Sequence, residues 1–386
     1  MSALTASLRR GIRALWSRKI FLAAMIAVPI GCALFFLDLM EEGLPLRTPV
    51  AVVDLDHSQL SRRITRNLAS SELVDVKVKV NSYAEAMNLT KSGEVYGFFL
   101  IPSEFERDAV SGRDTEISFY SNLTYFVPGT LAFKGFKSTA VMSAAGIAVT
   151  KLTSMGVGSE KAIDLMVPLS IQEHTPGNPW INYNIYLGNS FIPGVVALMV
   201  LLVTTFSITS EIKRGTSPQW LSAAGGSMLV ALAGKLIPQT VVFTAVGVLC
   251  QWMLYGLYHF PLGNHAMHII LAMFLLVTAS QSLGVIIASV VPNLRFSVSI
   301  SALVGILSFS IVGFSFPVDK MYPAVGIFAW CIPLRYYFLI YIDQALNGIP
   351  IWFSRYYYVA LLIFPLLSLP GLYKLRNHCN NPVYIP

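Results

Sequence analysis

The sequence predicts an α-helical polytopic membrane protein with six transmembrane helices and an α/β extracytoplasmic domain between helices 1 and 2. Of the 386 residues, 55% are hydrophobic and 12% are charged, whereas an ordinary soluble domain has about 25% charged residues. Seventeen of the 20 acidic residues lie in one window, residues 38–186. Outside it, long apolar runs alternate with short basic segments, so the basic excess indicates a membrane rather than nucleic acid.

Six apolar runs have about the 20 residues that a bilayer crossing requires. They are Ile20–Leu37, Leu187–Ile208, Met228–Tyr255, Ala266–Val291, Ser297–Phe316 and Tyr357–Leu372. A cleaved signal peptide is the alternative for the first run. That run is longer than a usual signal core and no convincing cleavage site follows it, so an uncleaved anchor is favoured.

The stretch Met321–Ile342 is also apolar, but prolines and charged residues interrupt it. We expect a pair of short helices that dips into the membrane from one face, within an external re-entrant segment, residues 317–347. A seventh span is the alternative. The candidate functional residues of this segment are Pro317, Asp319, Pro323, Pro333 and Arg335.

The distribution of Lys and Arg sets the orientation of the spans. Six spans place every basic cluster in the cytoplasm, whereas seven would place Lys374 and Arg376 outside, so six are preferred. The N- and C-termini are then predicted to be cytoplasmic. The predicted segments are a cytoplasmic amphipathic helix (1–19), the first span (20–37), the extracytoplasmic domain (38–186), a five-helix transmembrane domain (187–374) with a cytoplasmic loop (209–226), and a cytoplasmic tail (375–386).

The N-terminal segment predicts a helix that lies at the cytoplasmic membrane interface. Its apolar residues recur at helical spacing: Leu4, Leu8, Ile12, Leu15 and Trp16. Its cations lie off this stripe: Arg9, Arg10 and Arg13. A simple topogenic signal is the alternative function.

Strand and helix patterns alternate through the first half of the polar window, which predicts a small α/β sheet. The expected strands are 50–55, 73–80, 95–101 and 116–121. The expected helices are 58–70, 82–93 and 102–112, followed by a long helix over about Thr130–Met155. Ser58 and Ser82 are predicted N-caps, and Gly93 is predicted to end the second helix.

Asp54, Asp56 and His57 gather at the end of the first strand, where a turn and helix-capping role is favoured over metal binding or catalysis. The sequence contains no Gly-rich phosphate loop, no Gly-x-Ser-x-Gly elbow, no His-Glu-x-x-His motif and no zinc-type Cys/His spacing. None of the four cysteines lies in the polar window, so no disulfide is expected there. We therefore predict no catalytic residue, no metal site and no cofactor bound by this chain.

The polar stretch "EIKRGTSPQW", residues 211–220, separates two predicted spans. Gly215 allows a tight turn, and Thr216 or Ser217 is expected to cap a short helix that begins at Pro218. The charges in this stretch, among them Glu211, are expected to face a cytoplasmic partner. These residues alone favour equally a surface that docks to a cytoplasmic partner and a loop that serves only to orient the spans.

The sequence resembles the permease subunits of ATP-binding-cassette exporters of the type-2 membrane-domain family. More narrowly, it resembles the drug- and lipid-exporter subgroup, which has a large external domain after the first span. The resemblance runs through nearly the whole chain. It includes "VAVVDLDHSQLSRRI" (50–64), "SGEVYGFFLIPSEFERDAVSG" (92–112), "EIKRGT" (211–216) and "FSFPVDKMYPAVGIFAWCIPLRYY" (314–337).

The resemblance implies that the Glu-x-x-x-Gly-Thr turn opens a coupling helix, which docks into a groove on a separate ATPase subunit. The candidate coupling residues are Glu211, Lys213, Arg214, Gly215, Thr216 and Trp220. The N-terminal helix would contact the same ATPase, and its candidate residues are Leu8, Arg9, Arg13 and Trp16. The 317–347 segment would shape the external exit of the translocation path.

The resemblance also implies the partners and the location. ATP and Mg²⁺ are expected in the partner ATPase, because this chain lacks a phosphate loop. A second permease copy or a related permease is expected to complete the path. A periplasmic adaptor and an outer-membrane channel are further candidate partners, and the expected location is the inner membrane, with multidrug efflux as one candidate activity.

Uncharged polar residues in the spans are candidates for the translocation path, although helix-to-helix hydrogen bonding is the favoured role. The candidates are Asn189, Thr205, Gln239 and Gln281. Lys235 is expected to extend from its span toward the cytoplasmic surface. Such spans suit a hydrophobic or amphipathic substrate, and the alternative functions are an ion-driven secondary transporter or a membrane-anchored receptor.

Overall fold

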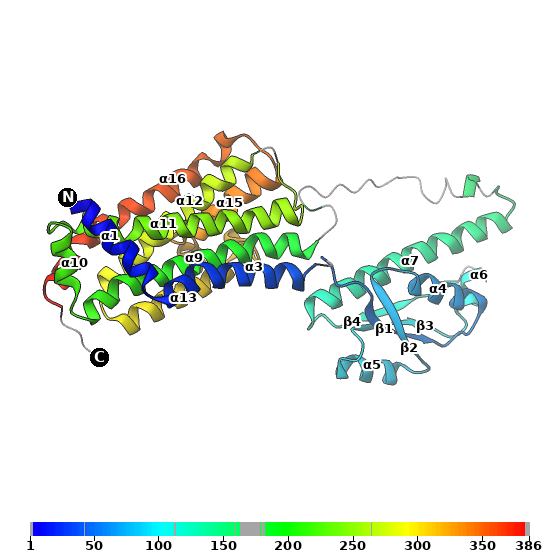
Figure 1. Cartoon of the computed structure of the whole chain (residues 1–386). Coiled ribbons are helices and arrows are strands. Elements are labelled where there is room, and N and C mark those ends of the chain that lie inside the picture. Colours follow the sequence, from blue (N-terminus) through cyan, green and yellow to red (C-terminus); the bar gives the residue numbers. More distant parts are fainter. Residues whose placement is uncertain are drawn as a thin grey trace. The chain divides into compact units, whose positions relative to one another are not determined.

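The computed structural model describes residues 3–41, 43–111, 113–158, 160–162, 178, 182–263 and 265–382. Residues 163–177 of the predicted extracytoplasmic domain and residues 383–386 of the predicted tail lie outside this set. The chain divides into two compact units (Figure 1). We call them the helical unit, Met1–Gly43 with His174–Pro386, and the polar unit, Leu44–Glu173.

The polar unit is a four-stranded sheet with helices on both faces, as the alternating pattern predicts (Figure 1). Its strands are β1 Thr48–Asp54, β2 Val74–Val80, β3 Gly97–Ile101 and β4 Ser118–Ser121, in the order β2-β1-β3-β4. Its helices are α4 Gln59–Ala69, α5 Tyr83–Ser92, α6 Phe105–Ser111 and α7 Phe126–Ser154. β1 pairs in parallel with β2 and β3, whereas β4 runs antiparallel to β3.

Alternating residues of β1 supply two separate cores, because successive side chains of a strand point to opposite faces. Val50 and Val52 pack against Ile64 of α4 and Phe136 of α7. On the other face, Ala51 and Val53 pack with residues of α5. The long helix α7 therefore shares one side of the sheet with α4.

Asp54 and Asp56, at the end of β1, bind backbone N–H groups of a turn and of a helix start, which confirms the predicted turn and capping role. One carboxylate oxygen of Asp54 accepts hydrogen bonds from the backbone N–H groups of Asp56 and His57, at 3.1 and 3.0 Å. Asp56 Oδ2 accepts from the backbone N–H of Glu106 in the first turn of α6, at 3.1 Å. Ser58 and Ser82 cap α4 and α5 as predicted, and Gly93 ends α5 with a φ of +80°.

The helical unit contains long helices and short ones that flank them. The long or span-forming elements are α2 Lys19–Leu22, the π-helix η1 Ala23–Ala27, α3 Val28–Leu39, α9 Tyr183–Lys213, α11 Met228–Trp252, η2 Met253–Leu257, α12 Ala266–Val290, α13 Leu294–Ile311, α16 Ile351–Leu367 and α17 Leu369–Asn380. The short elements are α1 Ala3–Trp16, α10 Ser217–Ala223, η3 Val318–Lys320, α14 Pro323–Trp330, α15 Pro333–Tyr341 and η4 Ile342–Leu346.

Six helical segments among the described residues are long and apolar enough to cross a membrane. They are Lys19–Leu39, Tyr183–Lys213, Met228–Leu257, Ala266–Val290, Leu294–Ile311 and Ile351–Asn380. The second and fourth pack against each other and are the most buried, so α9 and α12 form the centre of the bundle. The chain is therefore a multi-pass membrane protein.

The bundle has two ends with different contents. Helix α1, the turn between α9 and α10, and α17 meet at one end, where Ser217 Oγ donates a hydrogen bond to the carbonyl oxygen of Cys379 at 2.9 Å. We call this the basic end. At the opposite end, the Tyr186 hydroxyl donates to the carbonyl oxygen of Phe314 at 2.9 Å. There, the backbone N–H of Gly263 donates to the carbonyl oxygen of Ala345, also at 2.9 Å.

The segment between α13 and α16 forms the predicted pair of short helices. Helix α14 and the continuous pair α15–η4 are bent by 81° at a short break. Phe314, which precedes the pair, and Ala345, in the last turn of the pair, both contact the end of the bundle opposite the basic end. Both ends of the segment thus contact the same end of the bundle, and the re-entrant pair stays a prediction beside a broken seventh span.

Candidate functional site

Three charged side chains, Arg10, Glu211 and Lys235, meet beneath the turn at the basic end. We call these three residues, together with their hydrogen-bond partners Ser207 and Thr216, the Glu211 cluster. Glu211 lies in the last turn of α9. Its Oε2 accepts from Arg10 Nη2 of α1 at 3.0 Å, and its Oε1 accepts from Lys235 Nζ of α11 at 3.0 Å. The side chains of Glu211 and Lys235 are only 12% and 8% exposed, so this ion pair is largely withdrawn from solvent.

Lys235 is held entirely by groups of the helical unit. Its ammonium also donates to the carbonyl oxygen of Ser207 at 2.7 Å and lies 4.2 Å from the centre of the Trp220 ring. Trp220 is itself buried, and its Nε1–H donates to the carbonyl oxygen of Ala231 at 3.2 Å. The prediction that Lys235 extends to the surface is wrong, because a carboxylate, a carbonyl and an aromatic face bind the ammonium inside the bundle.

The turn after α9 is fixed by Gly215 and Thr216. Gly215 has a φ of +67°, which confirms the predicted tight turn, and a glycine adopts this conformation without steric cost. The Thr216 hydroxyl donates to the Glu211 carboxylate. Thr216 takes the predicted N-cap position, but α10 begins at Ser217 rather than Pro218, and no side-chain capping bond forms. Ser217 bonds to α17 instead.

Helix α1 contacts α11 through small residues. Its buried residues are Ser7, Gly11 and Leu15, which lie on one face at four-residue spacing. A Cβ atom at Gly11 would lie 2.1 Å from the carbonyl oxygen of Gly234, so the two backbones touch. Small residues at this spacing permit such a close crossing.

The predicted interfacial residues lie on the other faces of α1. Of the apolar stripe, Leu4, Ile12 and Trp16 are exposed, with Trp16 at 70%, whereas Leu15 is buried in the bundle. Arg9 and Arg13 are exposed and Leu8 is half-buried, whereas Arg10 turns inward to Glu211. An exposed apolar stripe next to exposed cations is the surface that an interfacial helix requires.

The predicted coupling residues fall into two groups. Lys213, Arg214 and Gly215 are exposed at the turn, whereas Glu211, Thr216 and Trp220 contact other parts of the helical unit. The expectation that Glu211 presents its charge outward is therefore wrong: its carboxylate faces Arg10 and Lys235.

Sequence reasoning missed the cluster, although one signal was present. Glu211 is the sole acidic residue between positions 174 and 318, and Lys235 is a cation within a predicted span. A buried charge requires a partner of opposite sign, so these two residues could have been paired.

The four candidate path residues are all buried and bond to neighbouring helices. The hydroxyl of Tyr255 donates to Asn189 Oδ1 at 2.8 Å, and Thr205 Oγ1 lies 2.9 Å from Ser301 Oγ. Gln239 Nε2 donates to Ser207 Oγ at 3.2 Å, and the hydroxyl of Thr240 donates to Gln281 Oε1 at 2.8 Å. These bonds join α9 to η2, α13 and α11, and α11 to α12, which is the arrangement that helix-to-helix hydrogen bonding requires.

The residues of the predicted re-entrant segment shape the bent pair. Pro323 and Pro333 begin α14 and α15, where a missing backbone N–H costs nothing. Arg335 Nη1 donates to the carbonyl oxygen of Val312 at 2.8 Å, and its guanidinium lies 4.4 Å from the centre of the Trp330 ring. Pro317 precedes η3, and Asp319 is exposed. Arg335 thus joins both short helices to the end of α13.

Within the described ranges, no group of three or more His, Cys, Asp or Glu side chains is arranged to hold a metal ion. Comparison with curated proteins found no match to this chain. Residues 19–372 match the model of the ABC-2 family transporter proteins. Because this match covers most of the sequence, the chain belongs to that family.

Proposed function

We propose that this ABC-2 family member is the permease subunit of an ATP-binding-cassette exporter that moves a hydrophobic or amphipathic substrate, such as a drug or lipid, out of the cytoplasm or inner leaflet. A separate ATPase subunit would supply the energy, because the sequence contains no phosphate loop. ATP and Mg²⁺ then bind in that partner. The observation that carries the proposal is the exposed turn at residues 213–215, held by the buried Glu211 cluster.

The geometry of the turn suits the transmission of movement. Lys213 and Arg214 expose two cations to a docking partner, and the hydroxyl of Thr216, in the same turn, donates to the Glu211 carboxylate. Glu211 in turn is bonded to α1 through Arg10 and to α11 through Lys235. A displacement of the turn by the ATPase would therefore act on three helices together.

The interior of the bundle supports transport that is not coupled to the movement of an ion. The charged pair Glu211–Lys235 is satisfied within the cluster, and the four candidate path residues are uncharged. The alternative is an ion-driven transporter, and the observation that favours it is the same buried carboxylate–ammonium pair. The two functions differ in whether an ATPase binds the turn.

Two permease copies, identical or related, would complete the path, since one bundle buries its own polar residues between its helices. The basic end would face the cytoplasm with both termini, and the polar unit would lie outside the inner membrane, as the positive-inside rule requires. A periplasmic adaptor and an outer-membrane channel are proposed partners of the polar unit.

The test is affinity purification of the full chain from its native membrane in mild detergent, with mass spectrometry of the co-purified proteins. The test variant is Lys213→Glu with Arg214→Glu, because both side chains are exposed at the turn. The matched control is Lys77→Glu with Lys79→Glu, which reverses two exposed cations of the polar unit. We expect a phosphate-loop ATPase near one copy per permease with wild type and control, and its loss from the test variant. Equal recovery from both variants would contradict the proposed docking turn.

A further inference from the structure

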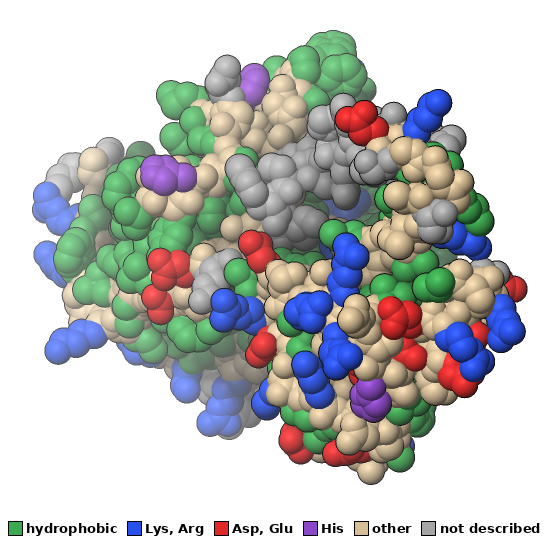
Figure 2. All heavy atoms as spheres, turned by 90° about the vertical axis from the view of Figure 1, so that its right-hand side faces the viewer, with side chains coloured by type: hydrophobic (Ala, Val, Ile, Leu, Met, Phe, Trp, Pro, Cys, Tyr) green, Lys and Arg blue, Asp and Glu red, His purple; other side chains and the backbone are tan. Residues whose placement is uncertain are grey.

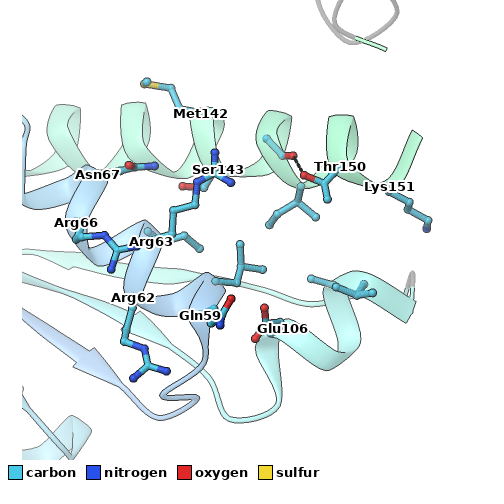
Figure 3. A pocket seen from close by; sticks show the side chains of 16 residues that line it. Gln59, Arg62, Arg63, Arg66, Asn67, Glu106, Met142, Ser143, Thr150 and Lys151 are labelled. Carbon is cyan, nitrogen blue, oxygen red and sulfur yellow. Dashed lines mark hydrogen bonds between the residues drawn. The ribbon is translucent and has the colours of Figure 1, made fainter. Parts of the chain in front are cut away.

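The polar unit contains a cavity of about 640 Å³ between α4, α6 and α7 (Figure 3). This volume lies within the range of small-molecule sites, roughly 300–1,000 Å³. It is too small to enclose a folded partner. Its apolar lining comes from all three helices and includes Leu60, Ile64, Ala109, Val110 and Ile147.

Cations surround this apolar lining. Arg62, Arg63 and Arg66 of α4 and Lys151 of α7 line the cavity, and Glu106 is the one carboxylate among its lining residues. The visible face of the polar unit carries side chains of both signs (Figure 2). Within the described ranges, Arg63 and Arg66 lie in no ion pair. The cavity therefore concentrates positive charge in a unit whose overall charge is close to neutral.

A buried polar atom at the cavity has no partner among the described residues. Ser143 of α7 lines the cavity and is 7% exposed, and its Oγ makes no hydrogen bond to the described part of the chain. A helical serine commonly bonds to a carbonyl of the preceding turn, as Thr150 bonds to Gly146. Figure 3 shows the Arg63 side chain reaching from α4 toward α7 beside Ser143. The Arg63 guanidinium and the Ser143 hydroxyl thus place two hydrogen-bond donors side by side in the cavity (Figure 3).

One turn further along α7, the cavity wall is open at Gly146. This glycine lines the cavity, and a Cβ atom there would meet no heavy atom within 4 Å. A glycine in the interior of a helix costs about 1 kcal/mol relative to alanine. The missing side chain leaves apolar space next to the donor groups.

We propose that this cavity is a binding site for a small amphiphilic anion, with one short apolar chain or ring and a phosphate or carboxylate head. The head would bind to Arg63, Arg66 and the Ser143 hydroxyl, and the apolar part would pack against Leu60 and Ile147. The arginines select the head group, because one guanidinium can donate two parallel hydrogen bonds to two oxygens of a phosphate or carboxylate. The site lies outside the proposed coupling turn and does not depend on it.

The test uses the full chain in nanodiscs of zwitterionic lipid, with ¹³C-methyl methionine as a local reporter. Met142 lines the cavity, and its methyl signal is identified by its disappearance in Met142→Leu. The probe is decyl phosphate, compared with decanol and with inorganic phosphate. We expect a saturable shift of the Met142 signal with decyl phosphate, and at least about tenfold weaker responses to decanol and to inorganic phosphate.

Three variants separate the contributions of charge and space. Arg63→Gln with Arg66→Gln should weaken decyl phosphate binding by about tenfold, whereas the matched control Lys77→Gln with Lys79→Gln should not change it. Gly146→Leu should abolish the response by filling the cavity, without loss of folding, because leucine is a better helix former. An unchanged affinity in the arginine variant, or equal binding of decanol, would overturn the anionic specificity. An unmoved Met142 signal with every probe would overturn the site itself.

These outcomes are distinct from those of the coupling proposal. The measurement requires neither ATP nor an ATPase, so it stays informative when no ATPase is recovered. Tight binding of inorganic phosphate alone would assign the site to a free anion and would contradict the amphiphile.

Discussion

Gly11 of α1 and Gly234 of α11 meet backbone to backbone, and a Cβ atom at Gly11 would lie 2.1 Å from the Gly234 carbonyl oxygen. At this crossing, α1 comes close enough to α9 for Arg10 to bond to Glu211 at 3.0 Å. The position of the N-terminal helix is thus set by two glycines and one ion pair. The proposed function uses this contact, because it joins α1 to the end of α9 that leads into the coupling turn.

Gly11→Ala should therefore detach α1. The added methyl group overlaps the Gly234 carbonyl, and overpacking of this kind costs about 1–3 kcal/mol. Trypsin cleavage after Arg9 and Arg13 in detergent-solubilised protein reports the detachment, and we expect it to accelerate severalfold.

The control for this substitution is Gly31→Ala in α3, where a Cβ atom would meet nothing within 4 Å. It should leave the cleavage rate unchanged. Similar rates for Gly11→Ala and wild type would show that the crossing tolerates a side chain.

Removal of one partner from the Glu211–Lys235 pair should destabilise the helical unit. Glu211→Gln leaves a buried ammonium without its counter-ion, and Lys235→Met leaves a buried carboxylate with Arg10 alone. Each single variant should lower the free energy of unfolding by about 3–5 kcal/mol. Unfolding in mixed detergent micelles measures this difference.

The double variant Glu211→Gln with Lys235→Met should recover part of that loss, because it leaves neither charge unpaired. Lys213→Gln, an exposed cation on the same turn, should change the stability by no more than about 0.5 kcal/mol. Strict additivity of the two cluster variants would mean that the pair is not coupled.

Arg335→Met should loosen the bent helix pair. The substitution removes the bond to the Val312 carbonyl and the contact with the Trp330 ring while keeping an apolar side chain. Hydrogen exchange should increase in residues 312–335 and stay unchanged in α9. Lys320→Met, which changes an exposed cation of the same segment, is the control; equal exchange in both variants would remove the proposed role of Arg335.

Much of the fold is predictable because its signals are local. The apolar runs predict the spans from their length, and Ser58, Ser82 and Gly93 predict the ends of helices from chemistry that acts within a few residues. The direction of β4 was not predictable in this way. A strand pattern of four residues is the same in a parallel and an antiparallel pair, and only the partner β3 decides between them.

The Glu211 cluster depends on contacts that no local pattern contains. Arg10 and Glu211 are separated by 201 positions, and they meet only because α1 crosses α11 at two glycines. The turn sequence identified the right place, since Gly215 and Thr216 do form the turn. It could not show that Glu211 faces inward, because the same Glu-Ile-Lys-Arg sequence suits a surface loop equally well.

The most direct test of the proposed coupling is photo-crosslinking in the native membrane. A benzophenone amino acid replaces Lys213 at the turn in one variant and Tyr322, which is 76% exposed on the re-entrant segment, in the other. Mass spectrometry then identifies the crosslinked proteins. We predict crosslinks to a phosphate-loop ATPase from position 213 and none from position 322. Crosslinks to such an ATPase from 322, or their absence at 213 in a membrane that contains the assembled transporter, would contradict the account.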